Sequence, residues 1–397
     1  MLRPLFFLTI LTVTAPTAHA QWQLQDAHTT ADLRGIDNLG GGVAWASGSN
    51  GTILRTEDAG FVWQLCAKPP NGEHLDFRGV QGIDNNTAII MSIGKGDLSR
   101  LYKTTDGCQS WTLLFTNPDK DGFFDALVVG PSIDTTAGKK QLWVLGDPVN
   151  GRFRIFHSAD DAMTRFVPDE TLSLTAPSNK SGVFAASNSS LLVLAKGPEI
   201  PVGPPLPPPP PGSPRKNHYA IATPPALYFV TGGEGGSRVY VRQPEQMYDM
   251  NLNPEWKSFP LPLGDGSDSS GAFSIALTEH HVGVVVGGDY AKPTITTSAA
   301  AFVSPKTGHW TAATTPPHGF RSAAAYDSKS KTWITVGPNG TDISTDDGRN
   351  WRALKPDPKF NEPPDADQHW NALSLPYVVG PHGRIATLRP SALMSPK

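Results

Sequence analysis

The sequence predicts an all-β fold built from repeated, short-stranded sheets. The chain of 397 residues contains 39 glycines and 38 prolines, which indicates many turns. Apolar residues come in short runs, for example at 142–145 and 282–286, whereas long stretches with helical periodicity are scarce. One turn pattern also recurs along the chain. Together these observations favour short strands that repeat at a regular interval.

The first twenty residues have the features of a secretory signal. Arg3 precedes an apolar run over residues 5–13, and Ala18 and Ala20 frame a small-residue cleavage site. This run is too short to span a bilayer, and no later apolar stretch approaches the roughly 20 residues that a membrane helix needs. We therefore expect a mature chain from about Gln21 that is periplasmic or secreted and has no membrane span.

Charge and motif content argue against several functional classes. The formal net charge of -3 is spread along the chain, so the basic surface of a nucleic-acid binder is missing. The pair His280 and His281 belongs to no metal-ligand pattern, and the glycines at 40–42 are not followed by the helix of a phosphate loop. Residues 119–122 lack the later acidic ligands of a calcium loop. We expect a monomer without a metal or cofactor.

Three segments share one turn pattern, in which an Asp follows a hydroxyl residue by two positions and a Trp follows it by seven. The Asp and hydroxyl side chains can hydrogen-bond turn amides, and the Trp can bury itself between neighbouring sheets. We interpret these Asp residues as structural, with catalysis or metal binding as the alternative. A fourth copy at Asp160 lacks the Gly and the Trp. The three pairs are Asp58 and Trp63, Asp106 and Trp111, and Asp346 and Trp351.

The chain contains two cysteines, Cys66 and Cys108, and the second lies inside one of these turns. An oxidising compartment after export allows them to pair. We predict a disulfide between them, with two separate buried thiols as the alternative.

Aligning the first strand of each repeat gives seven matches and predicts a seven-bladed β-propeller of four-stranded blades. Several neighbouring matches are about 44 to 50 residues apart, close to the ~40 to 50 residues of such a blade. The last repeat lacks its fourth strand, which residues 22–25 can supply, and this closes the ring without an exposed sheet edge. We expect one domain over residues 21–397. The matches begin at Leu33, Phe77, Phe124, Phe184, Phe273, Phe320 and Trp370.

A proline-rich insertion interrupts the fourth repeat at about residues 196–223. Residues 207–211 are all proline, and such a run has few ladder donors and prefers an extended conformation. We expect an exposed spacer, with a ligand for a proline-reading partner as the alternative.

With these turns and repeats, the chain resembles the Asp-box (BNR) propellers of the sialidase superfamily, and among them the photosystem II stability/assembly factor-like proteins. The resemblance covers essentially the whole mature chain, although Cys108 stands where the turn signature has Gly. The motifs specify the fold more than the activity, because the same fold hosts hydrolases, assembly factors and receptors. The resemblance implies an exported, non-catalytic scaffold or assembly factor for a protein client or an anionic ligand.

The second residue of each inner strand is expected to face the central channel. Arg34, Arg78 and Arg321 would then lie on one arc, with Asp125 and Asn371 beside them. Planar guanidinium groups bind carboxylates bidentately and remain charged, which fits an anionic ligand. The alternative is that the arginines pair with Asp125 and nearby carboxylates.

Sialidase-like hydrolysis of an acidic sugar is the alternative function. The resemblance implies an arginine triad, a tyrosine nucleophile assisted by a glutamate, and an aspartate acid/base. Tyr290, Glu234 and Asp147 are the residues that could take these roles. The hydrolase hypothesis requires that they converge on the arginines, whereas the scaffold hypothesis predicts no such convergence.

Overall fold

The computed structural model describes residues 21–132, 139–168, 174–195, 225–242, 256–304 and 308–393. The predicted signal segment and the proline-rich insertion lie outside these ranges. Within them the chain forms β-strands and short 3-10 helices, η1 (Gly96–Leu98), η3 (Pro358–Phe360) and η4 (Pro390–Leu393), and no α-helix. Over the same ranges, no helix has the length and apolar character to cross a membrane. The all-β prediction is confirmed.

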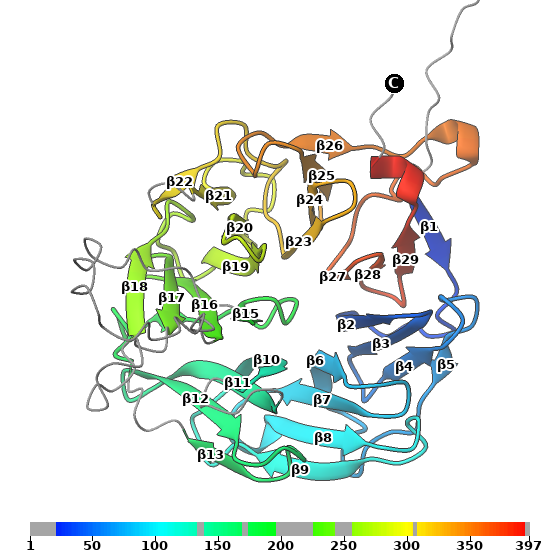
Figure 1. The fold of residues 1–397 in the computed structure, drawn as a ribbon, viewed down its shortest axis with the longest axis vertical. Coiled ribbons are helices and arrows are strands. Elements are labelled where there is room, and N and C mark those ends of the chain that lie inside the picture. The colour runs from blue at the N-terminus through cyan, green and yellow to red at the C-terminus, as the bar shows by residue number, and fades with distance from the viewer. Residues whose placement is uncertain are drawn as a thin grey trace, which may run out of the picture.

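The described strands form six hydrogen-bonded sheets that surround a common centre (Figure 1). Four of these sheets each contain four consecutive strands. The first has β2 (Leu33–Gly40), β3 (Val43–Gly48), β4 (Ile53–Thr56) and β5 (Gln64–Leu65). The second has β6 (Asp76–Gly82), β7 (Ala88–Ile93), β8 (Arg100–Thr104) and β9 (Thr112–Thr116). The third has β10 (Phe124–Pro131), β11 (Lys140–Val149), β12 (Arg152–Ser158) and β13 (Phe166–Pro168). The fourth has β23 (Ala323–Asp327), β24 (Thr332–Gly337), β25 (Gly340–Ser344) and β26 (Arg352–Leu354).

A further four-stranded sheet combines strands from both ends of the described chain. It contains β27 (Ala372–Ser374), β28 (Tyr377–Val379), β29 (Ile385–Leu388) and β1 (Trp22–Gln25). β1 runs antiparallel to β29, with Trp22 opposite Leu388. The predicted pairing of residues 22–25 with the C-terminal repeat therefore occurs in the structure.

The remaining sheet has nine strands and is held together at its middle by glycine. Its order is β18 (Trp256–Pro260), β17 (Arg238–Arg242), β16 (Ala226–Gly233), β19 (Ser270–Leu277), β20 (Gly283–Asp289), β21 (Ala300–Val303) and β22 (Trp310–Ala312), while β14 (Ser181–Gly182) and β15 (Leu191–Leu194) also pair with β16. Gly232 of β16 faces Gly271 of β19. A Cβ added to Gly232 would lie 2.6 Å from the Cα of Gly271, so this junction requires glycine.

Tryptophan side chains fill the spaces between neighbouring sheets. Trp63, at the end of the first repeated turn, lies 5.7 Å from the ring of Tyr377 in β28. Trp45 of β3 packs edge-on against Trp111, beside the second sheet, at 6.5 Å. These buried rings remove large apolar areas from water where two sheets meet, which stabilises their mutual packing.

The three repeated turns share one hydrogen-bond pattern. In the last one, Ser344 Oγ donates to Asp346 Oδ1 at 2.8 Å and accepts from Gly348 N at 3.0 Å. Asp346 Oδ1 also accepts from Asn350 N at 3.0 Å. The turns that begin at Thr56 and Thr104 repeat these bonds. The Asp side chains are thus engaged in holding each turn.

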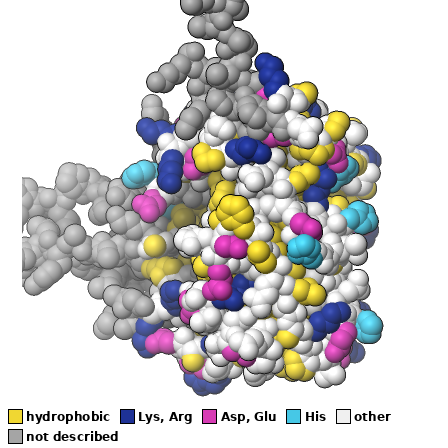
Figure 2. All heavy atoms as spheres, turned by 90° about the vertical axis from the view of Figure 1, so that its right-hand side faces the viewer, with side chains coloured by type: hydrophobic (Ala, Val, Ile, Leu, Met, Phe, Trp, Pro, Cys, Tyr) yellow, Lys and Arg dark blue, Asp and Glu magenta, His cyan; other side chains and the backbone are white. Residues whose placement is uncertain are grey.

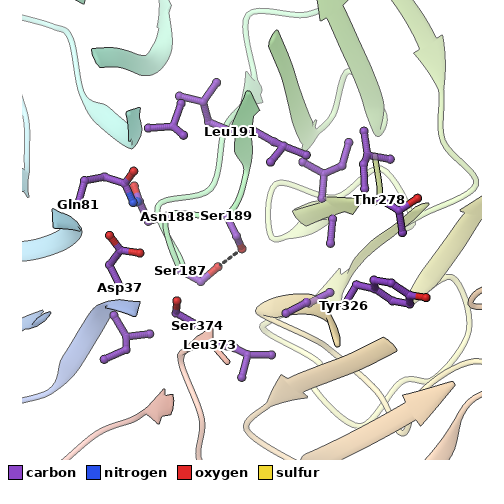
Figure 3. Close-up of a pocket in the computed structure, with 18 of the residues that line it drawn as sticks. Asp37, Gln81, Ser187, Asn188, Ser189, Leu191, Thr278, Tyr326, Leu373 and Ser374 are labelled. Carbon is purple, nitrogen blue, oxygen red and sulfur yellow. Dashed lines mark hydrogen bonds between the residues drawn. The ribbon is translucent and has the colours of Figure 1, made fainter. Parts of the chain in front are cut away.

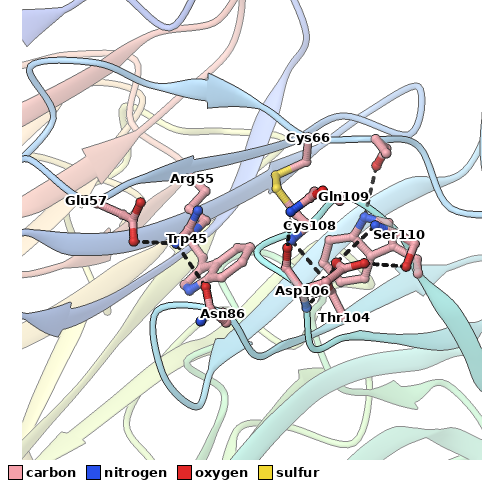
Figure 4. The surroundings of a disulfide bond; sticks show 12 residues. Trp45, Arg55, Glu57, Cys66, Asn86, Thr104, Asp106, Cys108, Gln109 and Ser110 are labelled. Carbon is pink, nitrogen blue, oxygen red and sulfur yellow. Dashed lines mark hydrogen bonds and ion pairs between the residues drawn. A yellow bond between two sulfur atoms is a disulfide. The ribbon is translucent and has the colours of Figure 1, made fainter.

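The disulfide between Cys66 and Cys108 joins the first and second sheets (Figure 4). The two Cα atoms are 5.3 Å apart. Ala67 N donates to Cys108 O at 3.1 Å, and Trp111 Nε1 donates to Ala67 O at 2.9 Å. The chain after β5 is therefore fixed to the second repeated turn by both covalent and hydrogen bonds.

The outer surface carries charges of both signs. Figure 2 shows basic, acidic and histidine side chains scattered over one side of the molecule, with hydrophobic side chains in small groups between them. This distribution matches a net charge of -3 that is spread along the chain. A strong field of one sign does not build up on this side.

Candidate functional site

A short irregular segment, residues 183–190, lies between β14 and β15 and reaches toward the centre of the sheets (Figure 1). We refer to it as the central segment. Arg78 Nη1 of β6 donates to Ala185 O at 3.0 Å, and Leu127 N of β10 donates to Asn188 Oδ1 at 2.8 Å. Ile275 N of β19 donates to Ser189 O at 2.9 Å. Strands from three sheets thus anchor the central segment.

The inner strand that the sequence predicted to begin at Phe184 does not form. Ala, Ser and Asn side chains dominate the segment, and Ser and Asn readily bond to main-chain groups in place of a strand ladder. Residues 183–186 line one cavity and residues 187–189 line another. The central segment therefore stands between two separate cavities.

The larger cavity, of about 960 Å³, brings together most of the predicted site residues. Arg34 lies in β2, and Arg78 lies at the equivalent place in β6. Burial and the neighbouring charge of Arg78 lower the pKa of the Arg34 guanidinium. An anion placed between the two guanidinium groups would relieve this repulsion. The predicted residues that line the cavity are Arg34, Arg78, Asp125, Asp147, Tyr290 and Asn371.

Both arginines have carboxylate partners at the start of their own strands. Arg78 Nε lies 2.9 Å from Asp76 Oδ2, and Arg34 Nη2 lies 3.9 Å from Asp32 Oδ2. The two arginines thus pair with nearby carboxylates, as the alternative hypothesis predicted. Their partners are Asp76 and Asp32, and not Asp125. About a quarter of each arginine side chain stays exposed, at 27% for Arg78 and 29% for Arg34, so both can also contact a ligand.

Two coupled carboxyl groups form another part of the wall. Asp125 is 1% exposed, and its Oδ2 has no hydrogen-bond partner in the described structure. Burial, with a further contribution from Asp147, raises the pKa of Asp125 well above its usual range. Burial also raises the pKa of Asp147 to about 6, although Val183 N donates to its Oδ1 at 2.9 Å. Both carboxyl groups of this wall therefore hold their protons to higher pH than an exposed aspartate does.

Aromatic rings form a further part of the wall. Phe184 of the central segment stacks on Phe273 of β19, with ring centroids 3.9 Å apart. Phe320 meets Phe273 edge-on at 4.7 Å. Tyr290 is 54% exposed and approaches both stacked rings, at 6.3 and 6.1 Å. The cavity can thus hold an anionic group on one side and an apolar or aromatic group on the other.

Arg321 is not part of this site, and its predicted role in ligand binding is wrong. Its side chain is fully buried, and Nε donates to Asp342 Oδ2 of β25 at 3.0 Å while Nη1 donates to Phe320 O at 2.9 Å. The strand of this repeat begins only at Ala323, so Arg321 precedes it and turns into the protein. Asp342 holds it there, because a buried guanidinium group is stabilised by a carboxylate partner.

The residues predicted for hydrolysis converge only in part. Tyr290 and Asp147 line the arginine cavity, but Glu234 is not among the described residues that line it. Glu234 instead forms an exposed ion pair with Lys180. Asn371 lines the cavity while its Nδ2 donates to Leu33 O at 2.9 Å, which ties the last sheet to the first.

The aromatic wall was missed as part of the site. The alignment of inner strands included these aromatic residues, but it used them to mark where each strand begins and did not identify them as ligand contacts. Each of them directly precedes the residue of its repeat that was predicted to face the channel. This shared position could have identified them as part of the site. They are Phe184, Phe273, Phe320 and Trp370. Over the described ranges, no group of three or more His, Cys, Asp and Glu side chains could hold a metal ion.

Comparison with known proteins shows the fold of the chain. No protein-family model and no curated protein sequence matches it. Among solved structures it is similar to YCF48 bound to D1 peptide, with a TM-score of 0.58, 14% identity, and coverage of 94% of this chain and 98% of that one. A GH74 xyloglucanase from Xanthomonas campestris has a TM-score of 0.56 and 14% identity over 92% of this chain and 53% of that one. The WD40 β-propeller domain of Doa1 has a TM-score of 0.52 and 10% identity over 94% and 98%. These likenesses show that the fold is a β-propeller.

Proposed function

We propose that this protein is an exported, non-catalytic β-propeller scaffold that binds a segment of a protein partner in the cavity of Arg34 and Arg78. The observation that carries the proposal is the composition of this cavity. Two partly exposed arginines face a stacked aromatic wall within about 960 Å³. A peptide supplies the matching groups, since it offers carboxylates for guanidinium groups and side chains for aromatic surfaces.

The similarity to YCF48 supports a protein partner. That protein is described as bound to D1 peptide, and it shares the fold over 94% of this chain. A rigid propeller with a wide cavity at its centre can present such a surface without chemistry of its own. The client of this chain is a separate question, because the two proteins are only 14% identical.

The proposed architecture is one domain over residues 21–397 with seven Asp-box blades of the sialidase-superfamily type, exported after cleavage near Ala20. The nine-stranded sheet counts as two blades, since Gly232 and Gly271 form the one residue pair between β16 and β19. Added to the five four-stranded sheets, these two make seven. The pairing of β1 with β29 supports closure of the ring between the first and last blades. The shared bonds of the repeated turns support the Asp-box assignment.

Site-specific photo-crosslinking in the native cell envelope tests the proposal. A photoreactive phenylalanine analogue at position 290 should crosslink to one protein partner, because Tyr290 is an exposed cavity residue. Adding Arg34→Ala should greatly reduce the crosslink. The matched control is Arg352→Ala, which removes an exposed arginine from the outer strand β26. Equal crosslinking with Arg34→Ala and Arg352→Ala would contradict the proposal.

A sialidase-like glycoside hydrolase is the second candidate. Tyr290, Asp147 and two arginines in one cavity favour it, and so does the likeness to a xyloglucanase. The position of Glu234 opposes it, because the tyrosine then lacks its assisting carboxylate. Purified protein should not release a fluorescent sialoside leaving group or reducing ends from xyloglucan faster than the Tyr290→Phe variant does. Turnover that Tyr290→Phe abolishes would establish the hydrolase instead.

A further inference from the structure

The second cavity lies on the other side of the central segment and has a different chemical character. Its volume is about 590 Å³, within the range of small-molecule sites. Aliphatic residues make up half of its lining, and the walls come from several sheets around the centre (Figure 3). Representative members are Ile36 of β2, Leu127 of β10, Leu191 of β15, Ile275 of β19 and Leu373 of β27. Such a surface favours an apolar body of compact size.

Asp37 places a carboxyl group in this apolar cavity (Figure 3). Its Oδ2 accepts a hydrogen bond from Gly82 N at 2.8 Å. Burial nevertheless raises the pKa of Asp37 to about 6. Among the described residues that line this cavity there is no Lys or Arg. The charged form of Asp37 thus has little compensation inside the protein, and a bound cation would supply it.

Several amide and hydroxyl groups of the wall already have partners in the protein, whereas Thr278 Oγ1 has none among the described residues. Gln81 Oε1 accepts from Val129 N at 2.9 Å, and Asn188 Oδ1 accepts from Leu127 N. The hydroxyl groups of Ser187 and Ser189 lie 2.6 Å from each other. These bonds shape the wall, and Asp37 is the buried carboxyl group of the cavity, while the second carboxylate, Glu279, is exposed.

We propose that this cavity is a binding site for a small organic cation, in which a primary or secondary ammonium group pairs with Asp37 and an apolar body packs against Ile36, Leu191 and Leu373. The site is separate from the cavity of Arg34 and Arg78 and does not depend on the function proposed for that cavity. The two sites also differ in sign, since one presents arginines and the other a carboxylate.

Calorimetric titration with three matched probes tests the site. The full chain should bind 2-phenylethylammonium more tightly than 2-phenylethanol, and phenylacetate should bind weakest. Asp37→Asn should reduce the ammonium affinity about tenfold or more, the loss expected when a charged hydrogen bond is removed. Asparagine can still accept from Gly82 N, so the variant keeps its wall and should unfold at a temperature no lower than that of the wild type. Arg352→Ala, on the outer strand β26, is the matched control and should bind all three probes as the wild type does.

The pH dependence adds a readout that a structural role of Asp37 would not produce. The ammonium affinity should rise between pH 5 and pH 7 as Asp37 loses its proton, and Asp37→Asn should remove this rise. Glu279, His280 and Tyr326 also line the cavity, and a protonated imidazole would repel a cation. His280→Gln should therefore keep most of the rise. Equal binding of the three probes, or unchanged affinity in Asp37→Asn, would overturn the proposal.

Discussion

Arg78 Nη1 donates a hydrogen bond of 3.0 Å to the main-chain oxygen of Ala185, a residue 107 positions later in the chain. The same side chain forms part of the larger cavity and pairs with Asp76. Arg78 thus supports the central segment and also offers charge to a ligand. Experiments at this position have to separate these two contributions, and Arg34 offers the comparison because its ion pair is with Asp32 alone among the described residues.

Replacing Arg78 by Ala should lower the free energy of unfolding by about 1–2 kcal/mol, because Ala185 O then loses its donor. Arg34→Ala should cost less than about 0.5 kcal/mol, as is usual for a partly exposed side chain with a long ion pair. Urea unfolding followed by tryptophan fluorescence measures both values. Equal losses in the two variants would show that the bond to Ala185 adds no stability.

Breaking the buried pair of Arg321 and Asp342 should lower the free energy of unfolding far more than Arg78→Ala does. Both side chains are fully buried, so Asp342→Ala leaves an uncompensated guanidinium and should cost about 3–5 kcal/mol. The double variant Arg321→Met with Asp342→Leu should recover most of this loss. His318 also contacts Asp342, but it is 54% exposed, and His318→Ala should have a small effect. A double variant as unstable as Asp342→Ala would contradict this expectation. Chemical unfolding of these three variants and of the wild type provides the comparison.

Asp147 should make the protein less stable as the pH rises from about 4 to 6. Its pKa is about 6 in the fold and 3.8 for an ordinary aspartate, so the folded chain binds more protons than the unfolded chain in this window. The stabilising contribution is fully present below pH 3.8 and is lost as the pH passes through 6.

Asp147→Asn removes this titration and still accepts from Val183 N. At pH 7 the variant should be more stable than the wild type by about 1–2 kcal/mol, a value reduced for the partial exposure of the side chain. The difference between the two proteins, measured by urea unfolding at pH 4 and pH 7, should vanish at the lower pH. If the two proteins differed in stability by the same amount at pH 4 and pH 7, the titration of Asp147 would not be the cause of the difference.

Removing the disulfide should destabilise the protein by about 4 kcal/mol, as the chain-entropy estimate gives for cysteines 42 residues apart. The comparison is between the oxidised wild type and the Cys66→Ser, Cys108→Ser variant, each unfolded in urea. The reduced wild type should behave like the variant. A difference below about 1 kcal/mol would mean that the neighbouring hydrogen bonds alone hold the two sheets together.

The sequence was most informative where the determinants are local. Short apolar runs indicated the strands, and the spacing of Ser344, Asp346 and Trp351 indicated a turn whose bonds all lie within eight residues. The positions of Arg34 and Arg78 followed from the repeat, since their strands begin at Leu33 and Asp76, within one position of each other in the alignment.

Long-range partners limited the rest of the prediction. The alignment assumed one starting point for every inner strand, but the strand after Arg321 starts at Ala323, three residues after the predicted start at Phe320. A distant carboxylate on β25 then decides where that arginine points. The central segment was not predicted for the same reason. Its conformation depends on hydrogen-bond donors from β6, β10 and β19, which are distant in the sequence.

The pairing of β1 with β29 has a consequence for the order in which the protein is made. A ribosome synthesises β1 long before its partner, so this strand keeps an unpaired edge until translation reaches Leu388. An unpaired edge is open to association with other chains during that interval. Because Trp22 and Leu388 end up side by side, a short linker could join them, and a circular permutant opened at the turn of residues 40–42 would synthesise the two strands consecutively. In such a chain β29 and β1, which pair last in the native order of synthesis, would form a local hairpin.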